Sequence, residues 1–132
     1  MSKPIIDVAP DCGNSPRRKF IKEFNTAIAS GDSETISRSV SPQTVFQIAG
    51  KKEIIGAEKI LKAFEKTPMW KLKRLSIETI ITHGRDASSS GSFISTRDEF
   101  FAYSQVFKFN SAGGSQIKSV RIYLIKLKKN QS

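Results

Sequence analysis

Residues 101–125, FAYSQVFKFNSAGGSQIKSVRIYLI, decide the fold of this chain. Aromatic and β-branched side chains fill two runs, 99–110 and 117–129, on either side of the turn SAGGS at 111–115. Two such runs around a Gly-containing turn predict a long β-hairpin. Because the first half of the chain carries helical patterns, we expect this hairpin to belong to a curved sheet wrapped around helices.

The hairpin's strands carry apolar side chains on both faces. Phe101, Tyr103 and Phe107 share one face of the first strand, and Phe100 and Val106 lie on the other. A sheet face that meets water should be polar, so we expect both faces to be covered. Helices would cover one face. A second copy of the chain would cover the other, and we therefore predict a homodimer packed through the outer sheet face.

Upstream of the hairpin, a first helix is predicted to begin at Ser15-Pro16, since serine suits the N-cap and proline the first helical position. Gly31 is a plausible end for it. Apolar residues recur at helical spacing between these limits. Further helices are predicted over 32–38, with Asp32 or Ser33 as the cap, and over 57–66. Strands are predicted over 44–48, 53–55, 71–82, 86–95, 99–110 and 117–129.

The 132 residues suit one domain. We predict a flexible arm over 1–15 and a single domain over 16–132. The sequence has neither a signal-peptide pattern nor an apolar run that could span a membrane, so we expect a cytoplasmic protein with no membrane partner. Cys12, the single cysteine, cannot form an internal disulfide, and its place in the arm argues against a catalytic role.

The chain is basic, with 22 Lys and Arg against 12 Asp and Glu, a formal net charge of +10. Such a balance can attract nucleic acid or anionic ligands. It also fits a domain whose exposed strands carry lysine against aggregation, which we favour. A nucleic-acid partner is therefore the less favoured alternative. It would require one patch built from Lys71, Lys73, Arg74, Lys126, Lys128 and Lys129.

The order of predicted elements is helix, helix, strand, strand, helix and then four long strands. With the local sequences SPQTVFQIAGKKEIIGAEKILKAFEK at 41–66, HGRDASSSG at 83–91 and the hairpin at 101–125, this order resembles the nuclear transport factor 2-like superfamily, in its SnoaL-like (polyketide cyclase-like) branch. The resemblance implies an α+β fold. Its cone-like, curved, mixed or antiparallel sheet would wrap three helices from the N-terminal half around an apolar pocket, and dimerisation would use the outer sheet face.

Enzymes of this fold often hold a carboxylate or histidine inside the cone, and this chain departs from that pattern. Phe20 and Phe24 stand on the first helix where a phenol would be wanted, and the strand over 44–48 has Phe46 but no acid. The last strand reads Tyr123-Leu124-Ile125 where many members of the superfamily have Tyr-x-Asp. The missing acids weaken an enzymatic interpretation.

A few polar residues remain as catalytic candidates. His83 and Asp86 could share a hydrogen bond across a turn and serve acid–base chemistry, although a plain turn pair is favoured. Tyr103 could donate a hydrogen bond to a ligand, or be a core aromatic. Gln105 could orient a ligand carbonyl or pair across a dimer interface. A salt bridge is favoured for Arg121 over a ligand carboxylate.

We therefore predict a protein that binds a small hydrophobic molecule in the cone pocket. The first alternative is an isomerase-, cyclase- or dehydratase-type enzyme acting on a small carbonyl compound, and the second is an interaction module that uses the basic surface. No metal-ligand spacing and no phosphate loop is present, so no metal or cofactor is expected. The predicted pocket residues are Phe20, Phe24, Phe46, Trp70, His83, Tyr103, Gln105 and Tyr123.

Overall fold

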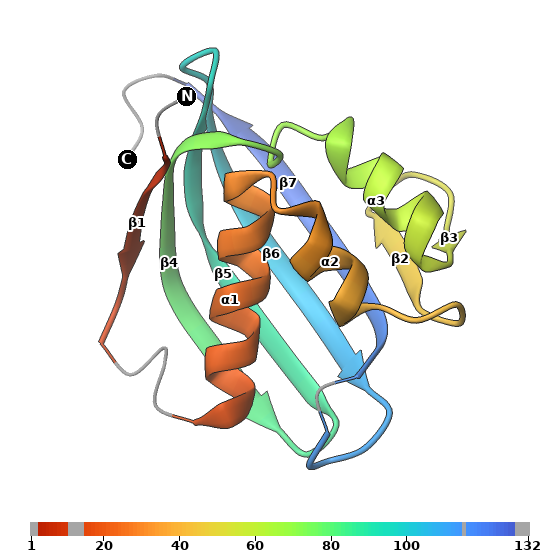
Figure 1. The fold of residues 1–132 in the computed structure, drawn as a ribbon. Coiled ribbons are helices and arrows are strands. Elements are labelled where there is room, and N and C mark those ends of the chain that lie inside the picture. Colours follow the sequence, from red (N-terminus) through yellow and green to blue (C-terminus); the bar gives the residue numbers. More distant parts are fainter. Residues whose placement is uncertain (1–2, 11–14, 115, 129–132) are drawn as a thin grey trace.

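The computed structural model describes residues 3–10, 15–114 and 116–128. Three helices lie against one face of a seven-stranded sheet with the strand order β1-β4-β5-β6-β7-β2-β3 (Figure 1). Among the described helices, none has the length and apolar character needed to cross a bilayer. The elements are β1 (Ile5–Val8), α1 (Pro16–Ser30), α2 (Ser33–Ser39), β2 (Val45–Ile48), β3 (Ile54–Ile55), α3 (Ala57–Glu65), β4 (Leu72–His83), β5 (Asp86–Ser95), β6 (Phe100–Phe109) and β7 (Ile117–Leu127).

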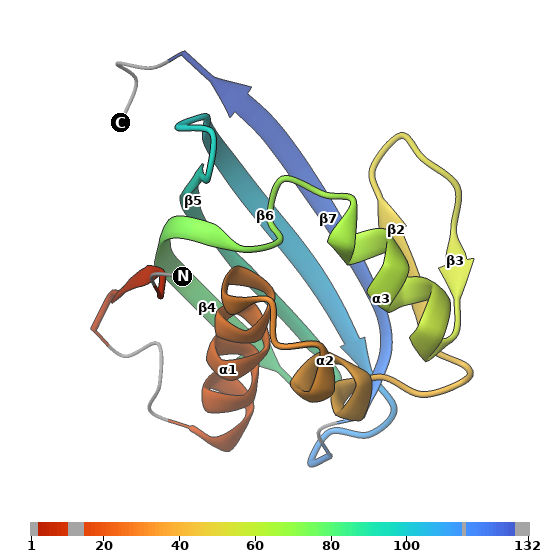
Figure 2. The same ribbon diagram turned by 45° about the horizontal axis from the view of Figure 1, so that its top comes forward.

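The sheet is mixed, one of the two arrangements expected from the sequence. β4 to β7 form an antiparallel meander, whereas β1 joins β4, and β2 joins β7, in parallel. The sheet curves around the helices without closing, and the β2–β3 pair and α3 stand at one side of the opening (Figure 2). The predicted α+β class, a curved sheet wrapped around three helices from the N-terminal half, is confirmed.

The helix ends follow the residues that predicted them. Ser15 Oγ accepts a hydrogen bond from the Arg18 N–H at 3.2 Å and caps α1. Gly31 ends the helix in the left-handed conformation, at φ 70°, which glycine adopts without the strain that a Cβ would bring. Asp32 caps α2, since its Oδ1 accepts from the Thr35 N–H at 3.1 Å.

The predicted flexible arm over 1–15 differs from the structure at residues 5–8, which form β1. Ile6 and Val8 are half-buried and pack on the core, while Asp7 pairs with Arg74 of β4. Apolar side chains on one face and a charged partner on the other suit an edge strand. Cys12 lies outside the described residues.

A β-bulge in β4 changes which side chains face the helices. The register with β5 shifts between Ile77 and Thr79, and this adds one residue to β4. As a result Ile80 is buried against the core, whereas Ile81 lies on the outer face and is 56 % exposed. Regular alternation from Leu75 and Ile77 predicts Ile81 and His83 on the same inner face, and the bulge makes this prediction wrong for both residues.

Gly91 of β5 sits opposite this bulge. A Cβ at this position would lie 2.0 Å from the carbonyl oxygen of Ser76 and 3.0 Å from the Tyr103 ring. A glycine inside a strand is typical of a bend or of a closely packed helix, but here the close neighbour is the backbone of β4.

Phenylalanine rings occupy the space between the helices and the sheet. The Phe24 ring of α1 lies 6.0 Å from Phe64 of α3 and 5.9 Å from Phe107 of β6, measured between centroids. Phe64 in turn contacts Phe46 of β2 at 4.6 Å. These rings are at most 1 % exposed, and they join two helices and two strands into one core.

Candidate functional site

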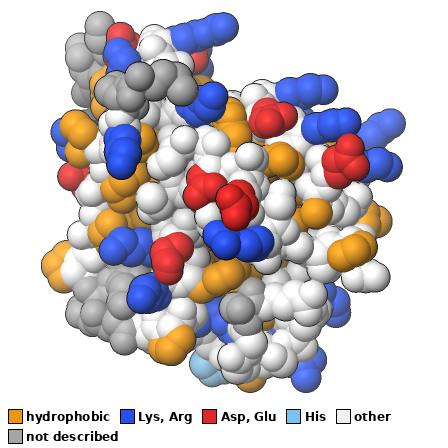
Figure 3. Space-filling model, in the orientation of Figure 1, with side chains coloured by type: hydrophobic (Ala, Val, Ile, Leu, Met, Phe, Trp, Pro, Cys, Tyr) orange, Lys and Arg blue, Asp and Glu red, His pale blue; other side chains and the backbone are white. Residues whose placement is uncertain are grey.

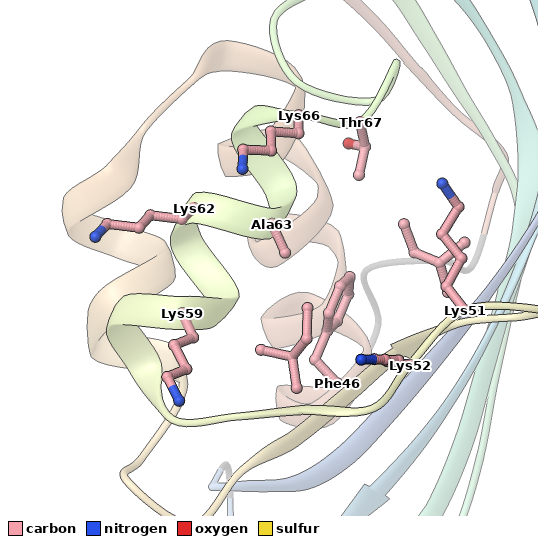
Figure 4. Close-up of a pocket in the computed structure, with 10 residues that line it drawn as sticks. Phe46, Lys51, Lys52, Lys59, Lys62, Ala63, Lys66 and Thr67 are labelled. Atoms are coloured by element: carbon pink, nitrogen blue, oxygen red, sulfur yellow. The ribbon is translucent and has the colours of Figure 1, made fainter.

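A cleft of about 400 Å³ opens beside this core, between α3 and the β2–β3 pair (Figure 4). Its floor is apolar and its rim is basic, and its volume suits a small ligand. The residues that line it are Phe46, Ile48, Lys51, Lys52, Ile54, Lys59, Lys62, Ala63, Lys66 and Thr67.

The floor of the cleft is continuous with the core. Phe46 is only 1 % exposed, and its ring packs on Phe64, which contacts Phe24. Ile48 and Ile54 are half-buried beside it, and Ala63 of α3 faces Phe46 with a single methyl group (Figure 4). The small side chain of Ala63 leaves room that a larger residue would fill.

Five lysines form the rim. Lys51 and Lys52 come from the connection between β2 and β3, and Lys59, Lys62 and Lys66 come from α3, with Phe46 and Ala63 between the two groups (Figure 4). Basic side chains also gather over α3 at the upper right of the molecular surface, with acidic side chains interspersed (Figure 3). Among the described residues that line the cleft, none is acidic.

Several basic residues elsewhere on the sheet have acidic partners. Lys73 pairs with Asp98 at 2.6 Å, Lys126 with Glu99 at 2.9 Å, and Arg74 with Asp7. These three cations belong to the set considered for nucleic acid, and Lys129 of that set lies outside the described residues. Within the described chain, Lys62 is the one rim lysine with an ion pair, to Glu58 at 3.6 Å.

The interior holds one buried polar network. Asn25 Nδ2 donates to Gln105 Oε1 at 2.9 Å, and Gln105 Nε2 donates back to Asn25 Oδ1 at 2.7 Å. Ser89 Oγ lies 3.5 Å from Asn25 Nδ2 and 3.3 Å from the Tyr103 hydroxyl. All four side chains are buried, and the two amides satisfy each other. Gln105 is therefore an internal partner of Asn25, an arrangement not among those considered from the sequence.

The predicted pocket residues are not brought to one place. Phe24, Phe46, Tyr103 and Gln105 are buried in the core, and Phe20 is half-buried against Phe24 and Phe109. Trp70 is half-buried and lines a separate hollow near the β5–β6 turn. Of the eight residues, Phe46 is the one that lines the cleft.

The remaining candidates face outward. His83 is exposed at the end of β4, and Asp86 accepts a hydrogen bond from Lys108 Nζ at 3.0 Å. Tyr123 is exposed on the outer sheet face beside Arg121, whose Nε donates to Gln47 Oε1 at 2.9 Å. Within the described residues, no three His, Asp or Glu side chains gather as metal ligands would.

Sequence reasoning missed the rim lysines, although a signal was present. Lys59, Lys62 and Lys66 recur at a spacing of three and four residues, which places them together on one side of a helix. The pair Lys51-Lys52 comes shortly before that helix, and only the short strand β3 separates them. Nothing in the sequence showed that the β2–β3 turn and α3 would frame an apolar floor.

Arg17 was also missed, and it closes the opposite end of the cone. Its guanidinium lies 3.8 Å from the centroid of the Phe109 ring and donates to carbonyl oxygens of both nearby turns. The partially buried site lowers the pKa of Arg17 by desolvation. The acceptors are Gly84 at 2.9 Å, Ser111 at 3.0 Å, Ala112 at 2.9 Å and Gly114.

No family model matches the sequence, and neither does any curated protein. Solved structures do match. A nuclear transport factor 2-like protein of unknown function from Burkholderia xenovorans superposes with a TM-score of 0.70 at 14% identity, covering 89% of this chain and 91% of that one. A protein described as a SnoaL-like polyketide cyclase from Shewanella denitrificans gives 0.69 at 12% identity, covering 84% and 92%.

A third structure is an LEH-like epoxide hydrolase from M. tuberculosis, with a TM-score of 0.61 at 17% identity, covering 81% of this chain and 80% of that one. At these identities the likeness concerns the fold, which carries several unrelated functions. It agrees with the helix order and with the curved mixed sheet described above. The chain has the nuclear transport factor 2-like fold.

Proposed function

We propose that this protein binds a small hydrophobic molecule at the mouth of the cone, in the cleft between α3 and β2–β3. The observation that carries the proposal is the apolar floor made by Phe46, Ile48 and Ala63 in a concave site of about 400 Å³. Ligand sites are typically concave and mostly apolar, with a few polar groups at their edges. Phe rings fill the space further inside, so the ligand would rest on the core rather than within it.

Filling the cleft tests this proposal. Ala63→Phe would project a ring from α3 toward Phe46, while Ala63→Ser keeps the volume of the site and serves as the control. The probe is octanol, and its binding is measured by the chemical shifts of ¹⁵N-labelled amides in α3 and β2. We expect octanol to bind the native protein and Ala63→Ser but not Ala63→Phe. Binding that is unchanged in Ala63→Phe, at unchanged melting temperature, would place the ligand elsewhere.

Binding is favoured over catalysis because of the groups that reach the cleft. Its described lining offers lysine ammonium groups and Thr67, whose hydroxyl already donates to the Phe64 carbonyl at 2.8 Å. An isomerase, cyclase or hydrolase needs an acid–base pair at hydrogen-bond distance from its substrate. The interior amides Asn25 and Gln105 are committed to each other.

We also propose a homodimer formed through the outer sheet face. Ile125 is 61 % exposed there, and Tyr123 and Val106 lie exposed beside it. A hollow of about 360 Å³ lies on the same face and includes Ala102, the residue paired with Ile125. A ridge next to a hollow on one surface is what a two-fold, self-complementary interface requires.

The dimer is tested by light scattering coupled to size exclusion. Ile125→Lys places a charge in the proposed interface, and Ser37→Lys is a control at an exposed residue of α2, on the helix side of the sheet. We expect the native chain and Ser37→Lys to elute as dimers and Ile125→Lys as a monomer. A monomeric native protein would refute the proposal. We also propose a cytoplasmic location, which cell fractionation would test.

A further inference from the structure

We propose that the ligand of the cleft is an anionic amphiphile, a molecule with an apolar body and a carboxylate, sulfate or phosphate at one end. This inference rests on the proposed binding function and adds the chemical class of the ligand. The apolar body would lie on Phe46, Ile48 and Ile54, and the anionic group would lie at the lysine rim.

The charge around the cleft carries the argument. Five lysines border one concave site on its two sides, and the described lining contains no acidic side chain to balance them. Glu58 neutralises part of this charge through Lys62. Like charges held together at a partly apolar surface raise the local potential, and a bound anion relieves their repulsion.

The contrast with the other end of the sheet supports a specific role for this charge. There, Lys73, Arg74 and Lys126 each have an acidic partner within the protein. Of the five lysines around the cleft, four have no such ion pair within the described residues.

The shape of the site favours a small amphiphile over nucleic acid. Binding to a nucleic-acid strand uses a basic track together with exposed aromatic side chains on which bases stack. The aromatic residue of this cleft, Phe46, is buried with its ring against Phe64 and can offer only part of its surface. A small amphiphile fits this site better, because its apolar tail can lie on the floor while its anionic head reaches lysines at the rim.

Three probes with eight-carbon chains separate the contribution of the head-group charge to binding from that of the alkyl chain. Octanoate, octanol and octyltrimethylammonium are titrated into the purified full chain by calorimetry. We expect octanoate to bind more tightly than octanol, and octyltrimethylammonium to bind least. The affinity for octanoate should fall as salt rises, because exposed charges are screened, while the affinity for octanol should not.

A lysine variant locates the anion. K51Q/K52Q/K59Q removes three rim charges, and Lys118→Gln on β7 is a control at an exposed lysine outside the cleft lining. At two- to threefold per exposed charge, we expect the triple variant to weaken octanoate binding by roughly tenfold. Octanol binding should be unchanged, and Lys118→Gln should behave as the native protein.

The outcomes distinguish the two proposals. Equal binding of octanoate and octanol, or an equal loss of both in the triple variant, would overturn the anionic class and leave hydrophobic binding intact. Binding of none of the three probes would overturn both proposals. Octanoate binding that responds to Lys118→Gln as strongly as to the triple variant would show a diffuse attraction to the net charge, which also overturns the site.

Discussion

The buried pair Asn25 and Gln105 gives the sharpest test of how the interior is held together. Gln105→Met replaces the amide by an apolar group of nearly the same shape, so packing changes little. It removes both hydrogen bonds, at 2.7 and 2.9 Å, that link β6 to α1. Among the contacts within the described residues, Asn25 then keeps only the long one to Ser89 Oγ at 3.5 Å.

The expected loss of stability follows from the amide that each single variant leaves without a partner. Asn25 is 1 % exposed, so water does not replace the lost partner, and an orphaned buried amide costs about 1–3 kcal/mol. Asn25→Leu should cost a similar amount, because it orphans Gln105 in the same way. The double variant Asn25→Leu/Gln105→Met orphans neither group, and replacing both partners by apolar groups of similar shape is close to neutral. We therefore expect the double variant to be more stable than either single variant.

Urea unfolding followed by circular dichroism measures the free energy of unfolding for the four proteins of this cycle. Because the double variant should be near neutral, the expected coupling equals the sum of the two single-variant costs, about 2–6 kcal/mol, with similar m-values throughout. The control is Ser37→Ala at an exposed position of α2, which should change stability little. Single-variant costs that simply add in the double variant would refute the reasoning, since they would show that neither amide depends on the other.

Three further predictions concern the fold. Gly91→Ala should destabilise the protein by about 3 kcal/mol or more in urea unfolding, because its Cβ would meet the β4 backbone at 2.0 Å, whereas Gly113→Ala has open space and should be neutral. Arg17→Ala should cost about 1–3 kcal/mol and speed amide exchange in both turns that the guanidinium joins, and lysine should not restore the protection. Asp32→Ala should cost about 1 kcal/mol near neutral pH. The pKa of Asp32 is lowered mainly by its hydrogen bond to the Thr35 hydroxyl, so its stabilisation is complete above the unfolded-state pKa. The difference in unfolding free energy between Asp32→Ala and the native protein, measured by urea unfolding, should therefore shrink as pH falls through the folded-state pKa of Asp32.

The sequence predicted the elements well where a residue has one strong local preference. Ser15 and Gly31 bound α1 because a side-chain cap and a left-handed backbone are properties of those residues themselves. The long hairpin was likewise predicted from aromatic and β-branched runs around a turn. β1 was missed because a strand of four residues carries little periodic signal, and because its partner β4 lies far along the chain.

Side-chain direction was harder to predict than element type. Alternation fixes the face of a strand residue only while the register is regular, and the bulge at Ile77 reverses it for Ile81 and His83. His83 therefore stands exposed outside the cone. The Asn25 partner of Gln105 was equally hidden, because a lone asparagine on a helix does not reveal which strand will face it.

The same aromatic side chains explain why the candidate site lies at the rim. A cone of this size could enclose a ligand, but Phe24, Phe64 and Phe107 meet within it at centroid distances near 6 Å and gain the apolar burial that a ligand would otherwise supply. The polar groups inside are consequently few and must satisfy each other, as Asn25 and Gln105 do. A ligand can then reach the core only where a ring approaches the surface beside a small residue. Phe46 next to Ala63 is such a place, and the lysines around it leave an anionic amphiphile as the molecule that fits both its floor and its rim.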